Sequence, residues 1–461
     1  MRFDLVVRGG SVVLPGTDGV AADIAVSDEK IAAVLTPGTA VDAAETLDAS
    51  GKTVLPGIVD VHLHLGHGKD IARPRVAEDA ATETAAAAVG GVTTFVPYLM
   101  ATDPFESLFE EVKEITEAGA RIDFGYHFII STEAQLAGVP RYVNEFGVPS
   151  FKIFMNNRGG EGKRLGLPDI DDGFLLRLCE LAAEHGGVVC PHPENIEAAW
   201  VLRNRMLARD PEGRGGLAAW NATRPPFVEA DAVQRAGLFA RVCGARLYIV
   251  HTSSREALEA AIRAREAGTK ITIETCPHYL THDVEWHGGE VGKINPPLRE
   301  RADRQALWDA VLTGSIDTVA TDHVHRDLSA KTGGIWQASP GCPGLETLLP
   351  VMLTEGHHAR GVPLGRIASL LSDTPAKAMG LSHRKGRIAV GLDADLAIVD
   401  LGRERVWRRD DVRSSAGYSI YEGRRLKGAV LHTLVRGRFV MRDGALVDSA
   451  VGTGRYVRRM V

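Results

Sequence analysis

Two histidines separated by one residue end a short apolar stretch near the start of the chain. The stretch is VLPGIVDVHLHL, residues 54–65, and its second half contains His62 and His64. Alternate side chains of an extended strand face the same side, so both imidazoles are expected to point in one direction. Neutral imidazole is a common metal ligand. The pair therefore predicts a metal site, and buried histidines satisfied by hydrogen bonds are the structural alternative.

Four further polar side chains occur in or directly after apolar runs: Lys152 in SFKIF, His192 after VVCP, His251 after LYIV and Asp322 after DTVAT. If these runs are parallel strands, their carboxyl ends open on one face of the domain. Buried polar groups need partners, and a metal ion would supply them. The histidines and the aspartate form a nitrogen and oxygen ligand set that suits Zn2+, with Mn2+, Co2+ and Fe2+ as alternatives.

Lys152 differs from the other candidates because an ammonium group, whose ordinary pKa is about 10.4, repels a metal ion. It could take part only after losing its charge. One interpretation is a carbamate formed with CO2, whose two oxygens can bridge two metal ions. The other is a lysine paired with a carboxylate, and the residue types alone leave both open.

The middle of the chain alternates short apolar strands with helical stretches, for example GVTTFVPYL followed by FESLFEEVKEITEAG. About eight strand candidates follow from His62 onward, the number that a parallel (β/α)8 TIM barrel needs, so we predict a barrel over residues 56–384. An open doubly wound sheet is the alternative. HLHLGHG stands where such a sheet would carry its glycine-rich dinucleotide fingerprint, which favours the barrel.

Both ends of the chain have a sequence pattern typical of short strands. Residues 1–55 and 385–461 contain apolar runs between Gly, Asp and Pro turn signals, including DLVVRGGSVVLP and AVLHTLVRGRFVMRDGALV. Chain ends often lie together. We therefore predict a small β-sandwich domain formed by both termini, and two unrelated β-rich decorations are the alternative.

The bulk composition is that of a soluble enzyme, with 44% hydrophobic and 24% charged residues. The net charge of -6 argues against a nucleic-acid partner, and no apolar segment is long enough to span a membrane. The five cysteines are scattered without a C-x-x-C pair, and no secretory signal is visible. A cytoplasmic protein with reduced thiols is expected.

The ordered set of motifs resembles the cyclic amidohydrolases of the amidohydrolase superfamily, which include hydantoinases, dihydropyrimidinases, allantoinases and dihydroorotases. The resemblance covers nearly the whole chain and is carried by GIVDVHLH, GGVTTF, FKIFM, PHPEN, LYIVHTSS, ETCPHYL, INPPLR, ATDH and PGLETLLP. It implies a metal-dependent hydrolase with a barrel, a β-sandwich from both termini, and assembly into a homo-oligomer, either a dimer or a tetramer.

The resemblance also implies roles for the six residues: His62, His64 and Asp322 bind the first metal ion, carboxylated Lys152 bridges both ions, and His192 and His251 bind the second. A hydroxide shared by the ions would attack the carbonyl carbon of a ring amide. Asp322 would serve as general base and then as general acid. The expected reaction is hydantoinase- or dihydropyrimidinase-like opening of a small cyclic amide or imide.

The predicted substrate contacts depart from the family pattern. Asn157 stands where a hydantoinase would carry a tyrosine that steadies the oxyanion, and an asparagine amide can also donate there. Asn295 in INPPLR resembles the dihydroorotase version of its loop, although the arginine expected after the paired histidines of a dihydroorotase is missing. The remaining predicted contacts are His323, Gly341 and Cys342.

Three alternative functions and two long segments remain open. The alternatives are an allantoinase- or dihydroorotase-type activity, a non-catalytic oligomeric homologue, and a mononuclear deaminase that would not need Lys152. The segments NRGGEGKRLGLPDIDD and RNRMLARDPEGRGGLAAWNATRPPF are rich in Gly, Pro and charge. They are interpreted as loops over the mouth of the site, with plain surface insertions as the alternative.

Overall fold

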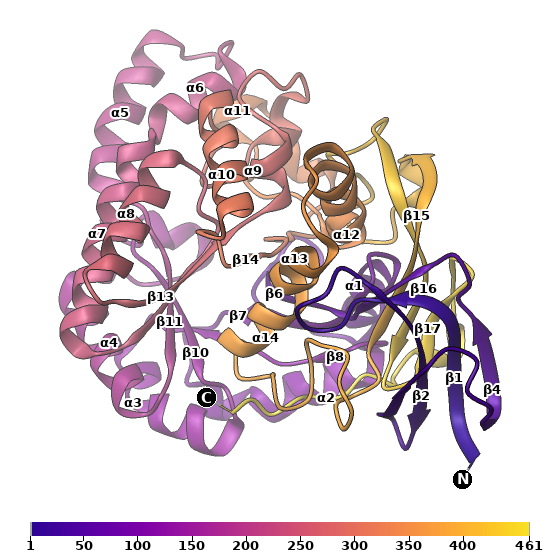
Figure 1. The fold of residues 1–461 in the computed structure, drawn as a ribbon. Coiled ribbons are helices and arrows are strands. Elements are labelled where there is room, and N and C mark those ends of the chain that lie inside the picture. The colour runs from indigo at the N-terminus through magenta and orange to yellow at the C-terminus, as the bar shows by residue number, and fades with distance from the viewer. Residues whose placement is uncertain (1, 461) are drawn as a thin grey trace.

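The computed structural model, which describes residues 2–460, contains two nine-stranded sheets. Figure 1 shows that strands from the two ends of the chain form one of them, beside a second sheet that helices surround. The second sheet comes from the middle of the chain and carries the candidate site.

The terminal sheet joins segments that are more than 300 residues apart in sequence. β5 (Thr53–Pro56) pairs antiparallel with β15 (Leu396–Val406), with Val54 opposite Ile398. The other strands are β1 (Arg2–Val12), β2 (Val20–Ser27), β3 (Lys30–Leu35), β4 (Asp42–Asp48), β16 (Arg425–Val435), β17 (Arg438–Arg442) and β18 (Ala445–Leu446). The prediction that both termini build one β-domain is confirmed.

The middle sheet follows the chain order from β6 to β14. Its strands are β6 (Ile58–Leu63), β7 (Val92–Leu99), β9 (His127–Ile129), β10 (Ser150–Phe154), β11 (Val188–His192), β12 (Arg246–Ile249), β13 (Lys270–Thr275) and β14 (Thr318–Val319), with β8 (Asp123–Phe124) added to β7. All of these pairs are parallel. Leu63 forms a parallel bridge with His323, and the N–H of His64 donates to the His323 carbonyl at 2.8 Å. The first strand thus meets the segment after the last one, as a TIM barrel requires.

Helices alternate with these strands and cover them. The helix α8 (Arg255–Glu266) illustrates why they form. Leu258 and Ala261 are buried while Arg255, Glu256 and Glu259 are exposed. The Ser254 hydroxyl accepts a hydrogen bond from the N–H of Ala257 at the first turn. The helices are α1 (Ala77–Val89), α2 (Phe109–Gly119), α3 (Glu133–Arg141), α4 (Asp172–Glu184), α5 (Ile196–Arg209), α6 (Gly216–Thr223), α7 (Pro226–Cys243), α8 (Arg255–Glu266), α9 (Pro277–Thr281), α10 (Arg301–Thr313), α11 (Gly334–Gln337), α12 (Leu348–Val351), α13 (Leu364–Ala368) and α14 (Thr374–Ala378).

A buried ion cluster fixes the terminal sheet to the barrel. The Lys385 ammonium lies 2.5 Å from Asp123 on β8 and 2.8 Å from Asp395, which precedes β15. Arg436, after β16, also pairs with Asp123. Buried charges are tolerated only when they are paired, and these pairs join β8 of the barrel to the segments beside β15 and β16.

Two further expectations concern the chain as a whole. Over residues 2–460, no helix combines the length and the apolar character needed to cross a bilayer. Each of the five cysteines is a free thiol.

Candidate active site

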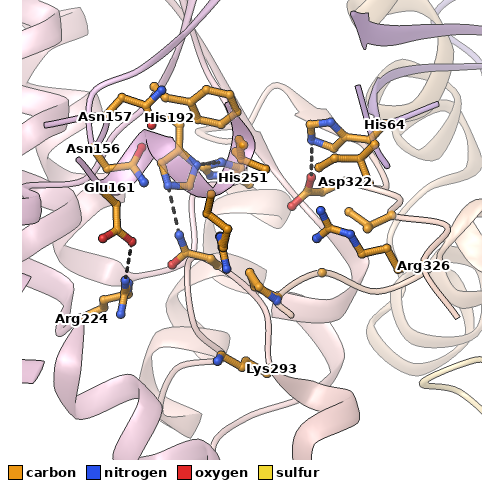
Figure 2. A pocket seen from close by; sticks show the side chains of 18 of the residues that line it. His64, Asn156, Asn157, Glu161, His192, Arg224, His251, Lys293, Asp322 and Arg326 are labelled. Atoms are coloured by element: carbon orange, nitrogen blue, oxygen red, sulfur yellow. Dashed lines mark hydrogen bonds and ion pairs between the residues drawn. The ribbon is translucent and has the colours of Figure 1, made fainter. Parts of the chain in front are cut away.

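One cavity at the carboxyl ends of the barrel strands is lined by all six residues predicted as metal ligands: His62, His64, Lys152, His192, His251 and Asp322. Figure 2 shows His192 and His251 together on one side of this cavity and His64 with Asp322 on another. The barrel explains the convergence, since strands that are neighbours in the sheet end on the same face.

Two of these residues follow their strands in an unusual backbone conformation. His251 has a φ of 40° and Asp322 a φ of 47°, both in the left-handed region that His and Asp enter more readily than most residues. Such conformations are costly and concentrate at functional sites. Here they occur just after β12 and β14, at the points where the side chains enter the cavity.

The first group consists of His62, His64 and Asp322. Asp322 Oδ1 lies 3.2 Å from His62 Nε2 and 3.9 Å from His64 Nε2, and one ligand atom from each residue lies within 4.8 Å of the others. Within residues 2–460, His64 Nδ1 is buried without a hydrogen-bond partner, and His62 Nε2 is also unsatisfied because its contact with Asp322 does not have hydrogen-bond geometry. A divalent cation would provide the missing partner, so this group fits a metal ion.

The second group consists of His192 and His251. His192 Nδ1 lies 2.8 Å from His251 Nε2, while His251 Nδ1 is another buried nitrogen that no described residue hydrogen-bonds. The rings of His62 and His251 are 5.3 Å apart between centroids, which places the two groups side by side. The second group thus places two further nitrogen donors beside the first.

Lys152 lies in β10 and is buried. Its Nζ is 4.6 Å from the centroid of the Tyr98 ring and 5.6 Å from that of Phe154. Burial lowers the pKa of Lys152, against the opposing effect of Asp322 and Glu274. Burial thus favours the neutral amine, which is the form that reacts with CO2.

The charges in the first group are strongly coupled. Burial alone would lower the pKa of His62, but the carboxylates of Glu274 and Asp322 outweigh it and raise the value to about 9. Burial lowers the pKa of His64 to about 3. Although burial opposes it, His62 and His64 hold the pKa of Asp322 below its usual range. The site therefore favours an ionised Asp322 carboxylate beside a protonated His62. A metal cation could replace that proton and supply the positive charge instead.

Glu274 on β13 positions two of the candidate ligands. Its Oε1 lies 2.5 Å from His62 Nδ1 and accepts the backbone N–H of His251 at 2.8 Å. A carboxylate on one ring nitrogen of a histidine directs the other nitrogen toward a metal. Here that other nitrogen is the unpartnered Nε2 of His62.

We expect Glu274→Gln to weaken metal binding by about 10–100-fold, because the neutral amide holds and polarises His62 less well than the carboxylate. Competition with a chelator measures the affinity. Glu229→Gln is the matched control, since Glu229 is a buried carboxylate that pairs with Arg299 and is absent from the described cavity wall. Equal affinities of the two variants would contradict the role of Glu274.

The structure places three of the five predicted substrate contacts in the cavity wall and two outside it. Asn157, Asn295 and Gly341 line the cavity, and Asn295 Nδ2 lies 3.4 Å from His192 Nε2. His323 and Cys342 lie outside the set of described residues that line it.

The prediction that His323 contacts substrate is corrected by the position of its ring. His323 is buried, with Nε2 2.9 Å from Glu83 and Nδ1 accepting the N–H of Gly344 at 3.0 Å. It follows Asp322 directly, but its ring turns away from the candidate metal ligands to the Glu83 carboxylate. Cys342 is also buried, and its carbonyl accepts the N–H of Val324 at 2.9 Å. Both residues hold the loop that presents Gly341.

Sequence reasoning missed a group of cavity residues on the two long segments. The first segment contains a short 3-10 helix, Glu161–Leu165, and the second forms the last half of α5 and all of α6, so its interpretation as a loop is wrong. Besides the predicted Asn157, the cavity residues on these segments are Glu161, Arg164, Leu165, Arg203, Trp220 and Arg224. The charge content of the segments was the available signal.

Comparison with known proteins shows the family of the chain. Residues 237–440 match the amidohydrolase family. The chain is 34% identical to a D-hydantoinase of Ralstonia pickettii, over 99% of each chain. The chain belongs to the amidohydrolase family. This amidohydrolase is also 36% identical to an allantoinase of Rubrobacter xylanophilus, over 99% of its own length and 98% of the relative.

The fold agrees with a solved relative of the amidohydrolase. The crystal structure of a dihydropyrimidinase from Brevibacillus agri superimposes with a TM-score of 0.88 at 31% identity, over 98% of each chain. Since the relatives are hydantoinases, dihydropyrimidinases and allantoinases, the amidohydrolase is an enzyme of the cyclic amidohydrolase group.

Proposed function

We propose that this amidohydrolase hydrolyses the ring amide of a small cyclic amide or imide, in a hydantoinase- or dihydropyrimidinase-like reaction. The observation that carries the proposal is the convergence of four imidazoles, a carboxylate and a buried lysine in one cavity. Three of those imidazoles present a buried nitrogen that no described residue satisfies.

Two divalent ions, which we propose to be Zn2+ with Mn2+, Co2+ or Fe2+ as alternatives, fit this donor set. His62, His64 and Asp322 would hold one ion, and His192 and His251 the other. Lys152, as a carbamate formed from its neutral amine and CO2, would offer oxygens to both. Bound metal ions lower the pKa of water towards neutrality and polarise a carbonyl group.

The residues of the chain supply proton transfer and orientation. The Asp322 carboxylate, ionised at neutral pH, can accept a proton from the attacking water and pass it to the leaving ring nitrogen. The side-chain amides of Asn157 and Asn295 can donate hydrogen bonds to the oxygen that gains negative charge. The backbone of the loop at Gly341 borders the same space and can bind the ring amide. The product is a ring-opened N-carbamoyl or related amido acid.

An allantoinase- or dihydroorotase-type activity is the second candidate. Two observations favour it: the 36% identity to an allantoinase, and Asn157 at the position where a hydantoinase is expected to have tyrosine. Both candidates use the same donor set, and only the ring that enters the cavity differs.

A substrate panel tests the proposal. Protein from cells grown with bicarbonate and the metal is incubated with hydantoin, dihydrouracil, allantoin, dihydroorotate and succinimide, and ring opening is followed by absorbance. We expect hydantoin or dihydrouracil to be opened, and a chelator to abolish the activity until metal is restored. Opening of allantoin or dihydroorotate alone would favour the second candidate, and opening of none would contradict both.

We also propose that the enzyme is a cytoplasmic homo-oligomer, either a dimer or a tetramer. The free cysteines suit a reducing compartment. α7 exposes three apolar side chains, Phe227, Leu238 and Val242, the last 72% exposed, and we propose this helix as part of the contact between subunits. Light scattering measures the mass, and a monomer would contradict the proposed assembly.

A further inference from the structure

The cavity wall carries an excess of positive charge. Leaving aside Lys152, whose amine is proposed to react with CO2, it includes the cations Arg164, Arg203, Arg224, Lys293 and Arg326, but its carboxylates are Glu161 and Asp322. Arg224 is neutralised, because its Nε lies 2.7 Å from Glu194 and its Nη2 lies 3.8 Å from Glu161. The other four cations have no carboxylate partner among residues 2–460.

Lys293 is the decisive member of this group, because it is only 3% exposed. Its Nζ donates to the Trp336 carbonyl at 3.2 Å and lies 4.2 Å from the centroid of the Trp220 ring. An ammonium group has three donors, and buried charges are normally paired with an opposite charge. Burial, together with Arg224 and other nearby cations, lowers the pKa of Lys293 to about 7. The position therefore lacks a counter-charge.

Arg203 on α5 is a second cation of the cavity wall without a carboxylate partner. Its Nε is buried and, over the described part of the chain, has no hydrogen-bond partner. Arg326 donates to the backbone carbonyl of Lys69 at 3.0 Å.

The position of Lys293 indicates where that anion would lie. In Figure 2 Lys293 stands across the cavity from His192 and His251, on the side away from the candidate metal ligands. An anion at Lys293 is thus separate from the amide that would react at the histidines. Both positions line the same cavity, so one ring with a substituent can face both.

We infer that the preferred substrate is a cyclic amide whose ring carries a carboxylate substituent, and that Lys293, assisted by Arg203, binds this carboxylate. The inference rests on the proposed ring-opening function and adds to it the chemical class of the substrate. Charge-assisted hydrogen bonds from an ammonium and a guanidinium to a carboxylate are among the strong polar contacts of proteins.

A pair of nearly isosteric substrates tests the inference. Hydantoin-5-acetate and hydantoin-5-acetamide differ in the charge of one group and little in shape. We expect kcat/KM for the acid to exceed that for the amide by about tenfold or more. Lys293→Met should reduce this ratio to about one, mainly through KM. Arg203→Gln should reduce it in part, and it serves as the second variant if Lys293→Met does not fold.

The control is Lys163→Met, which removes an exposed lysine outside the described cavity wall and should keep the ratio of the unmodified enzyme. An equal kcat/KM for acid and amide, or a ratio that survives both the Lys293 and the Arg203 substitutions, would overturn the inference.

A binding measurement separates this inference from the proposed function. Calorimetry with the Asp322→Asn protein, whose metal content is measured first by elemental analysis, compares the affinities for acid and amide without turnover. Tighter binding of the acid that depends on Lys293 supports the anion site even if no ring is opened, in which case the proposed function fails alone. Equal affinities overturn the anion site even if hydantoin is opened.

Discussion

Asp322→Asn lowers kcat for ring opening by about 10²–10⁴-fold, the usual contribution of a positioned acid or base. The carboxylate lies 3.2 Å from His62 Nε2, and nearby histidines keep it ionised. Asparagine keeps the shape and one oxygen but cannot carry a proton between the attacking water and the leaving nitrogen. Steady-state kinetics on the best substrate of the panel measure the effect.

Asp327→Asn is the matched control for Asp322, because Asp327 lies five residues further on, is exposed and caps the 3-10 turn at Leu328–Lys331. Its kcat should match that of the unmodified enzyme. An Asp322→Asn enzyme that keeps kcat within about twofold would remove Asp322 from the proton transfer, since a lost acid or base costs far more.

Lys152→Met is expected to lower both metal content and activity, the activity by at least about 10²-fold, because it removes the proposed bridging group and its electrostatic contribution. Methionine fills a similar volume beside Tyr98 and Phe154 without a nitrogen that can react with CO2. Elemental analysis and kcat/KM are measured on protein from cultures grown with and without added bicarbonate.

Two outcomes of the Lys152 substitution can be distinguished. A metal content that falls together with activity supports the bridging role. Unchanged metal content and activity would indicate mononuclear chemistry that does not need Lys152. A thermal melt of the variant shows whether any loss comes from unfolding.

The sequence predicted the barrel and the convergence of its polar side chains because both follow from local pattern. Apolar runs that alternate with helices form parallel strands, and residues at their carboxyl ends meet on one face. His62 and His64, Lys152, His192, His251 and Asp322 could therefore be placed in one cavity without knowledge of distances. Likewise, β-rich segments at both ends suggested the shared terminal domain.

The local sequence pattern did not predict which way individual side chains point or which distant residues they contact. His323 looked available because it follows Asp322, but its ring turns to Glu83, a residue far away in the chain. Lys293 is buried by contacts with distant residues: its ammonium group lies against the ring of Trp220 on α6 and donates to the carbonyl of Trp336 on α11. These contacts depend on how helices outside the barrel pack over its mouth, which no short-range spacing encodes.

The most direct test of the dinuclear site is a crystal structure of protein from bicarbonate-supplemented culture, with anomalous diffraction recorded at the absorption edge of the bound metal. Two anomalous peaks are predicted, one among His62, His64 and Asp322 and one beside His192 and His251, with electron density for a carbamate extending from Lys152 Nζ between them. A single peak beside an unmodified lysine, or no peak in active protein, would contradict this account.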